Sequence, residues 1–234
     1  KWTTDSRNRH CAFRRDFVSW VVRKSFRHRG WLLGAVLALA AVQRGQAEVR
    51  MAGIFSDHMI LQRGKPVPVF GTATPGEKVA VKFHGQALTT AADAHGAWLV
   101  NLAAMNADSN AQTMTVSGAN TLTFSDVLIG DVWLCSGQSN MDMRLGGCER
   151  PDDIAGADFP GIRQFTSPAG SWKVCTPATA AEFSGAAFYF ARKICQDQGA
   201  KIPVGLVLAS VGGTKIDLWL APDGLIDIPV LHPL

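Results

Sequence analysis

A short apolar run followed by a turn of small and polar residues most constrains what this chain can fold into. Residues 131–143 read DVWLCSGQSNMDM, so an apolar run at 132–134 leads directly into a turn around Ser139. An apolar strand with a serine-bearing turn at its end is how α/β enzymes expose a nucleophile at the carboxyl edge of a sheet. The alternative is a strand followed by an ordinary Ser/Asn helix cap.

A second apolar run ends in glycines. Residues 203–209 read PVGLVLA, as in a buried parallel strand, and residues 210–214 read SVGGT. Residues 143–169 are polar and rich in Gly, Pro and Asp, which predicts a loop that lines the substrate pocket. Apolar residues between 179 and 198 recur at three- and four-residue steps, which predicts a helix that Gly199 ends. Strand, helix and strand in this order imply a parallel crossover.

The two turns can act together if their strands are neighbours. The backbone N–H groups of Gly212 or Gly213 would then lie beside Ser139, and the two turns could hold an oxyanion. The alternative is a glycine turn without a catalytic role. We therefore expect residues 126–234 to be the start of an α/β domain with a parallel sheet.

Residues 48–125 have a different pattern. Short runs alternate between apolar and polar residues, as at 77–83 and 113–117, and turn signals such as Pro75-Gly76 separate them. A proline-rich strand at 65–71 suits a sheet edge. Short strands at this spacing predict a small antiparallel β-sandwich-like domain, with a role in packing or in carbohydrate contact.

The first 47 residues resemble a secretory signal. Several arginines and a lysine at 23–29 precede 12 uninterrupted apolar or glycine residues at 31–42, and small residues follow at 45–47. Twelve residues rise about 18 Å as a helix, too little for a hydrocarbon core of about 30 Å. We therefore expect export to a secreted, periplasmic or lysosomal-type compartment, without stable membrane insertion after cleavage. An uncleaved anchor is the alternative.

The charge distribution argues against a nucleic-acid partner. Residues 1–47 contain 10 Lys and Arg and 2 Asp and Glu, whereas the remaining residues contain 13 and 17. The basic character therefore lies in the leader, and the rest is mildly acidic, unlike a nucleic-acid-binding surface.

Cysteines and histidines do not indicate a metal site. Cys135, Cys148, Cys175 and Cys195 follow the leader without a CxxC spacing, and the sequence does not choose among their three possible pairings. Free buried thiols are the alternative to disulfides. The scattered histidines at 58, 84 and 95 are interpreted as surface or turn residues.

Four spaced segments resemble the sialate O-acetylesterase family, which belongs to the SGNH hydrolases together with the related acetylxylan esterases. The segments are FSDHMILQR at 55–63, GDVWLCSGQSNM at 130–141, FSGAAFYF at 183–190, and PVGLVLASVGGT at 203–214 followed by Trp219. The resemblance runs in order from about residue 52 to residue 219. It implies an N-terminal part of a three-layer αβα SGNH domain behind the β-rich region.

The resemblance also implies a reaction. Ser139 would be the nucleophile of an O-acetyl ester hydrolysis on a sialic acid or related sugar, such as a xylan unit. The N–H groups of Ser139 and of Gly212 or Gly213 would stabilise the oxyanion. Gln138 and Asn140 would shape the turn and the substrate pocket. No metal or organic cofactor is implied.

One part of the family pattern is missing. The family places an Asp-x-x-His pair downstream, but His232 is the only histidine after His95, and Asp227 precedes it at the wrong spacing. We therefore expect a fragment or deletion with an incomplete catalytic site, in which His232 is a weak candidate for a substitute base. Two other classes stay open: a carbohydrate-binding protein without catalysis, and a structural module in which Ser139 only caps a helix.

Overall fold

The computed structural model describes residues 48–215 and residue 219. The chain divides into two compact units, Lys1–Gly45 and Gln46–Leu234, and all described residues belong to the second unit. The expected leader at 1–47, His232 and Asp227 therefore lie outside the described residues. In the described part of the chain, no helix is both long enough and apolar enough to cross a membrane.

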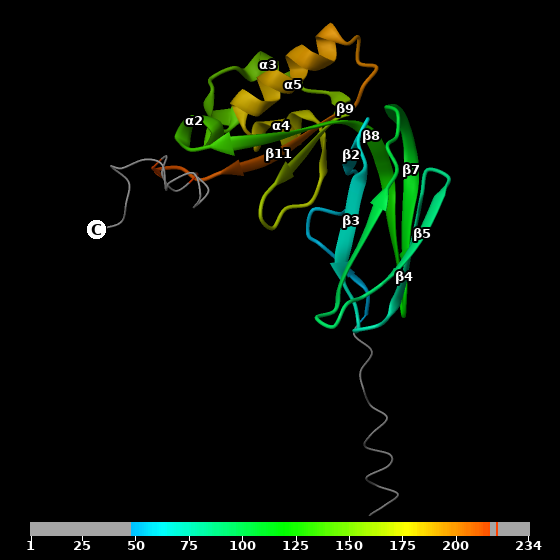
Figure 1. The fold of residues 1–234 in the computed structure, drawn as a ribbon. Helices are drawn as coiled ribbons and strands as arrows, with labels where there is room; N and C mark the ends of the chain where they lie inside the picture. The colour runs from blue at the N-terminus through cyan, green and yellow to red at the C-terminus, as the bar shows by residue number, and fades with distance from the viewer. Residues whose placement is uncertain (1–47, 216–218, 220–234) are drawn as a thin grey trace, which may run out of the picture. The chain divides into compact units, whose positions relative to one another are not determined.

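The described unit has a mostly β-sheet core with helices near its C-terminal side (Figure 1). A three-stranded sheet has the order β1-β3-β6, and an eight-stranded sheet follows the path β10-β9-β11-β8-β7-β4-β5, with β2 paired to β8. The strands of the β-rich part are β1 (Arg50–Met51), β2 (Ile60–Gln62), β3 (Val67–Thr72), β4 (Lys78–Phe83), β5 (Gln86–Ala91), β6 (Ala97–Leu102) and β7 (Asp108–Ser117).

Alternating side chains hold the β-rich part together. In β4, Val79, Val81 and Phe83 are buried while Lys78 and Lys82 are exposed, as the sequence pattern predicts. Buried side chains of β3, β6 and β7 join them in one apolar cluster. The expected β-rich N-terminal region is therefore present, with antiparallel pairing between β3 and β6 and between β4 and its neighbours.

The strand expected at a sheet edge, at 65–71, is β3, and it lies between two other strands. β3 pairs with both β1 and β6, so the expectation was wrong for the strand as a whole. However, β1 pairs only with Gly71 and Thr72, so the stretch around Pro68 has a neighbour on one side only. A proline, which has no N–H to donate, is tolerated there for the same reason that it is tolerated at an edge.

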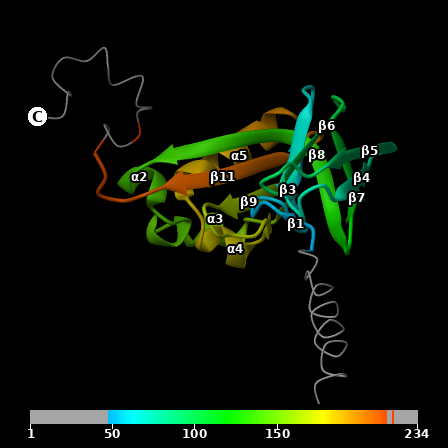
Figure 2. The same ribbon diagram turned by 60° about the horizontal axis from the view of Figure 1, so that its bottom comes forward.

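One long strand connects the two parts of the unit. β8 (Thr121–Gly137) pairs with β7 antiparallel along its first half and with β11 (Val204–Ser210) in parallel along its second half. The boundary expected between residues 125 and 126 falls inside this strand. Figure 2 shows β8 and β11 running side by side toward α2 (Ser139–Asp142). The parallel pairing of these two strands confirms the predicted neighbours.

The predicted helix at 179–198 is two helices. α4 (Pro177–Ala181) and α5 (Gly185–Asp197) are separated by residues 182–184. The Ser184 hydroxyl accepts a hydrogen bond from the Ala187 N–H and thereby starts α5 anew, and Thr176 caps α4. The apolar spacing continued across the break because both helices cover the same core.

The stretch at 143–169, expected to be a loop, contains a strand of the sheet. β9 (Phe159–Thr166) pairs in parallel with β11 and antiparallel with β10 (Lys173–Cys175), and it follows a 3-10 turn, η1 (Leu145–Gly147), and α3 (Pro151–Ala155). Buried Arg163 and Gln164 interrupt the apolar pattern of β9, which explains why the sequence did not reveal it.

The helices cover one face of the parallel strands. Val204, Leu206 and Leu208 of β11 belong to the apolar cluster that includes the buried residues of α5, among them Phe188. On the opposite face, the α-carbon of Gly205 lies against Ile60 and Trp172, so the N-terminal segment around β2 covers that side. A side chain at Gly205 would crowd both neighbours, because its Cβ would lie about 3.2 Å from each.

Candidate active site

Ser139 lies at the point where β8 ends, exposed on the surface. The strand ends at Gly137, and α2 begins at Ser139 after one intervening residue. Gly137 has a φ of 150°, and a Cβ there would lie 3.2 Å from the Cβ of Met141. A glycine therefore allows the sharp turn that presents the Ser139 hydroxyl beyond the sheet.

Gln138, and not Ser139, caps this short helix. The Gln138 Oε1 accepts a hydrogen bond from the Ser139 N–H at 3.0 Å and another from the Ser139 hydroxyl at 2.6 Å. The helix-cap alternative for Ser139 therefore does not match the geometry. Instead, one amide oxygen holds the two Ser139 groups that an ester hydrolysis would use.

The segment that leads into the glycine bend after β11 lies beside the end of β8. The Val211 N–H donates to the Gly137 carbonyl at 3.1 Å, and Ser210 is in register with Gly137. Gly213 has a φ of 78°, a left-handed conformation that favours glycine. The structure therefore brings together the two turns that the sequence singled out.

Asp142 forms a second connection between the same two turns. The Ser210 hydroxyl donates to Asp142 Oδ1 at 2.9 Å, and a Cβ on Gly212 would lie 3.5 Å from Asp142 Oδ2. Sequence reasoning missed both residues. Their only signal was their position, one at the end of a strand and the other one turn after the expected nucleophile.

A pocket of about 330 Å³ adjoins the turn. Gln138 and Gly137 line it from one side and Thr214 and Trp219 from the other, and the Trp219 indole N–H donates to the Thr214 hydroxyl at 2.8 Å. Asn140 is exposed on α2. None of the residues that line this pocket comes from 143–169, the stretch that we expected to form the substrate pocket.

None of the described histidines is bonded to Ser139. His58 pairs with Asp126 and His84 with Gln112, both in the β-rich part, and His95 lies in the turn between β5 and β6. Within residues 48–215 and 219, Ser139 therefore has an amide oxygen as its hydroxyl partner and no imidazole. Among the described residues, no three or more His, Cys, Asp or Glu side chains lie close enough together to hold a metal ion.

The cysteines of the described residues are free thiols: Cys135, Cys148, Cys175 and Cys195. Burial raises the pKa of Cys135 and of Cys195, and it raises the pKa of Cys175 to about 12. A thiol with a raised pKa stays protonated at neutral pH and is a poor nucleophile. These three thiols pack in the core rather than compete with Ser139 for chemistry.

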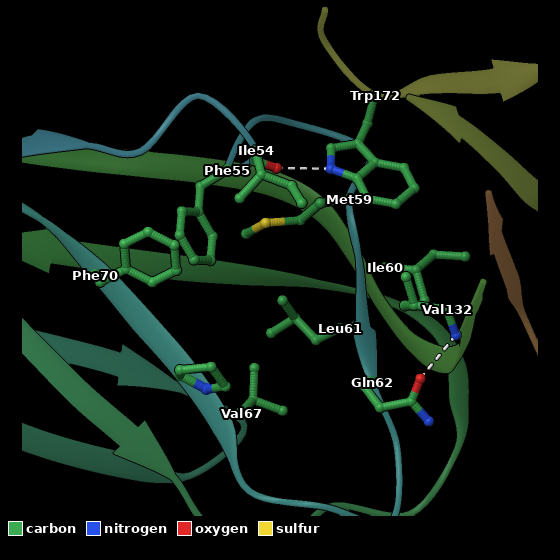
Figure 3. A pocket seen from close by; sticks show the side chains of 11 residues that line it. Ile54, Phe55, Met59, Ile60, Leu61, Gln62, Val67, Phe70, Val132 and Trp172 are labelled. Atoms are coloured by element: carbon green, nitrogen blue, oxygen red, sulfur yellow. Dashed lines mark hydrogen bonds between the residues drawn. The ribbon is translucent and has the colours of Figure 1, made fainter. Parts of the chain in front are cut away.

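A second pocket lies away from this site and is apolar (Figure 3). It has a volume of about 220 Å³ and is lined by Phe55, Met59, Leu61 and Phe70 with Trp172 at one end. Its polar groups already have partners, because the Trp172 indole N–H donates to the Ile54 carbonyl and the Val132 N–H to Gln62. It offers no nucleophile or acid, so the candidate active site is the one at Ser139.

The fold and the site define a class: a mixed α/β protein with an exposed serine in the turn that follows a parallel strand. Comparisons with known proteins agree. Residues 129–227 match the family model described as carbohydrate esterase, sialic acid-specific acetylesterase. The chain is 29% identical over 227 residues to the sialate O-acetylesterase of Mus musculus and 30% identical over 223 residues to that of Homo sapiens.

A solved structure is similar as well. A carbohydrate acetylesterase from Xanthomonas citri superimposes with a TM-score of 0.72 at 34% identity, covering 77% of this chain and 44% of that one. The two curated relatives are matched over 81% of this chain but over only 41% and 42% of their own lengths. The chain is similar to sialate O-acetylesterases, and it spans about two fifths of the length of these relatives.

Proposed function

We propose that this chain carries the nucleophile and oxyanion-binding part of a serine carbohydrate O-acetylesterase. The observation that carries the proposal is the junction of the two turns, where the Val211 N–H bonds to the Gly137 carbonyl beside the exposed Ser139 hydroxyl. The sialate and carbohydrate acetylesterases to which the chain is similar support O-acetylated sugars as the substrate class.

In this mechanism the Ser139 Oγ attacks the acetyl carbonyl carbon and loses its proton to a base. The N–H of Ser139 and that of Gly212 or Gly213 would donate to the oxyanion of the tetrahedral intermediate. The sugar leaves as an alcohol, and water then hydrolyses the acetyl-serine to release acetate. Before the attack, the Gln138 oxygen must leave the two Ser139 groups that it holds.

The base is the component that the described residues do not supply. Gln138 accepts the hydroxyl proton in a hydrogen bond, but a neutral amide is too weak a base to remove it. We propose that residues 48–215 and 219 form an incomplete site, and that the base of the active enzyme comes from elsewhere. Removal of a single triad member lowers turnover by several orders of magnitude.

Hydrolysis of acetyl esters by the purified chain tests both statements. We expect slow release of acetate from p-nitrophenyl acetate and from O-acetylated sialic acid, and loss of this activity in Ser139→Ala. Added imidazole, acting as an external base, should accelerate the wild-type chain more than Ser139→Ala. Turnover as fast as that of the full-length relatives, abolished by Ser139→Ala, would refute the incomplete site.

The same assay separates the alternatives. A chain that binds acetylated glycans, but shows no Ser139-dependent hydrolysis even with imidazole, would be a carbohydrate-binding protein instead. Comparison of acetylated sialic acid with acetylated xylan distinguishes the two sugar classes. We also propose that residues 1–47 direct export, which N-terminal sequencing of the protein recovered outside the cytoplasm would test.

A further inference from the structure

We infer that Asp142 is a positioning residue that fixes the Gly212-Gly213 bend against the Ser139 turn. The inference rests on the function proposed above, because the bend matters for catalysis only if its amides receive the oxyanion. Whether Asp142 holds the bend in place, however, can be measured without any assay of activity.

The Asp142 side chain bridges two segments that are far apart in the sequence. Its backbone belongs to α2, where its N–H donates to the Gln138 carbonyl at 2.9 Å, so its place relative to Ser139 is fixed by the helix turn. Its Oδ1 accepts from the hydroxyl of Ser210, the last residue of β11. The carboxylate therefore connects the helix that carries the nucleophile to the strand that leads into the glycine bend.

The second carboxylate oxygen lies over the bend itself. Asp142 Oδ2 is 3.5 Å from the position that a Cβ on Gly212 would occupy, an ordinary packing distance. In the part of the chain that the structure describes, the bend has one backbone bond to the other turn, from Val211 to Gly137. Two connections, one of backbone and one of side chain, therefore hold the start of the bend beside the Ser139 turn.

Asp142 acts through its shape and hydrogen bond rather than through its charge. A negative charge close to a developing oxyanion raises the energy of the transition state, so the charge itself does not assist the reaction. Asparagine keeps the oxygen that accepts from Ser210 and has no charge. Asp142→Asn should therefore preserve the position of the bend, whereas Asp142→Ala removes the bridge.

The first measurement is hydrogen–deuterium exchange of the peptide that contains residues 206–215. We expect faster exchange in Asp142→Ala and in Ser210→Ala than in the wild type, and wild-type exchange in Asp142→Asn. Asp152→Ala, which removes an exposed carboxylate from α3, is the matched control and should leave exchange in this peptide unchanged. Equal exchange in Asp142→Ala and wild type would overturn the inference, whether or not the chain is an esterase.

The second measurement is covalent labelling of Ser139 by a fluorophosphonate. We expect labelling of Asp142→Ala to be about tenfold slower in the chemical step, with little change in probe affinity, because misplaced amides stabilise the phosphonyl oxyanion less well. Asp142→Asn should label at least as fast as the wild type. With imidazole present as the external base in every sample, labelling of Asp142→Ala at the wild-type rate would overturn the inference, whereas absence of Ser139 labelling in the wild type would count against the proposed function instead.

Discussion

Two polar clusters, one on β8 and one just beyond its end, differ in how far their side chains are buried and in the number of hydrogen bonds that hold them. In the middle of β8, Asp126 accepts hydrogen bonds from Arg163 at 2.5 and 3.2 Å and lies 2.7 Å from His58 Nδ1. Beyond the end of β8, Ser139 and Asp142 are exposed. Two hydrogen bonds connect Ser139 to the Gln138 side chain, and one connects Asp142 to Ser210.

The two clusters have different tasks. Arg163 is only 4% exposed, so its charge needs the Asp126 carboxylate as a partner, and the pair connects β9 to the β-rich part. The exposed groups around Ser139 lose little hydration. The cluster around Arg163 therefore contributes to the stability of the fold, whereas the exposed cluster contributes little to it and, under the proposed function, takes part in the reaction.

The largest effect on stability should follow from removal of the central carboxylate. Asp126→Ala leaves the Arg163 guanidinium buried without a counter-charge, which should cost about 3 kcal/mol in the free energy of unfolding. Urea denaturation followed by circular dichroism measures this cost, with Asp152→Ala as the exposed control. A decrease of less than about 0.5 kcal/mol in the free energy of unfolding, typical of a surface substitution, would show that the cluster around Arg163 stabilises the fold no more than the exposed one does.

Substitution of a buried side chain next to Arg163 should increase the free energy of unfolding rather than decrease it. Gln164 is 2% exposed, and neither polar atom of its amide has a hydrogen-bond partner within the described residues. Gln164→Leu removes both groups at similar volume and should raise the free energy of unfolding by about 1–2 kcal/mol. The exposed Gln196→Leu on α5 is the control and should give no such gain. A destabilised Gln164→Leu would show that the amide has a partner after all.

Acid should weaken the buried cluster. Burial acts to raise the pKa of Asp126, but hydrogen bonds and charges from Arg163 and His58 outweigh it, so the pKa lies below its ordinary value. The resulting stabilisation is complete above the unfolded pKa, about 4, and is lost as the pH falls through the folded pKa. Denaturation between about pH 6 and pH 3 should therefore show a steeper loss in the wild type than in Asp126→Asn. Parallel curves would contradict this assignment.

The smallest effect on stability should come from the nucleophile itself. Ser139→Ala removes an exposed hydroxyl whose partner is the neighbouring Gln138, so the free energy of unfolding should change by less than about 0.5 kcal/mol. Thermal unfolding of the variant used as the inactive control checks this directly. A larger destabilisation would mean that Ser139 has a structural role that the two exposed turns do not reveal.

The fold could be predicted only where the side-chain pattern is regular. Strands with clean alternation, such as β4, and the continuous apolar run of β11 were found from sequence alone. β9 was missed because the polar residues Arg163 and Gln164 occupy buried positions in it, and the partner of Arg163 is Asp126, which is distant in sequence. The helix break at 182–184 was missed because a cap at Ser184 does not disturb the apolar spacing.

The candidate site, too, has residues that the sequence predicts and contacts that it does not. Gln138, Ser139, Gly212 and Gly213 follow strand ends, and strand ends can be read from a sequence because apolar runs stop there. The Asp142–Ser210 bridge depends on two strands adopting one register, in which Ser210 faces Gly137. No local pattern contains that information.

By itself, the sequence determined which residues could carry chemistry: a serine turn and a glycine bend, each placed after an apolar run that must become a strand to bury its side chains. Only the tertiary structure decided that the two turns meet, that Gln138 holds the Ser139 hydroxyl, and that buried Arg163 finds its carboxylate on β8. The physical reason is that apolar patterns and turn residues are local properties of the sequence, whereas hydrogen bonds between distant segments exist only once the sheet has fixed its strand order and register.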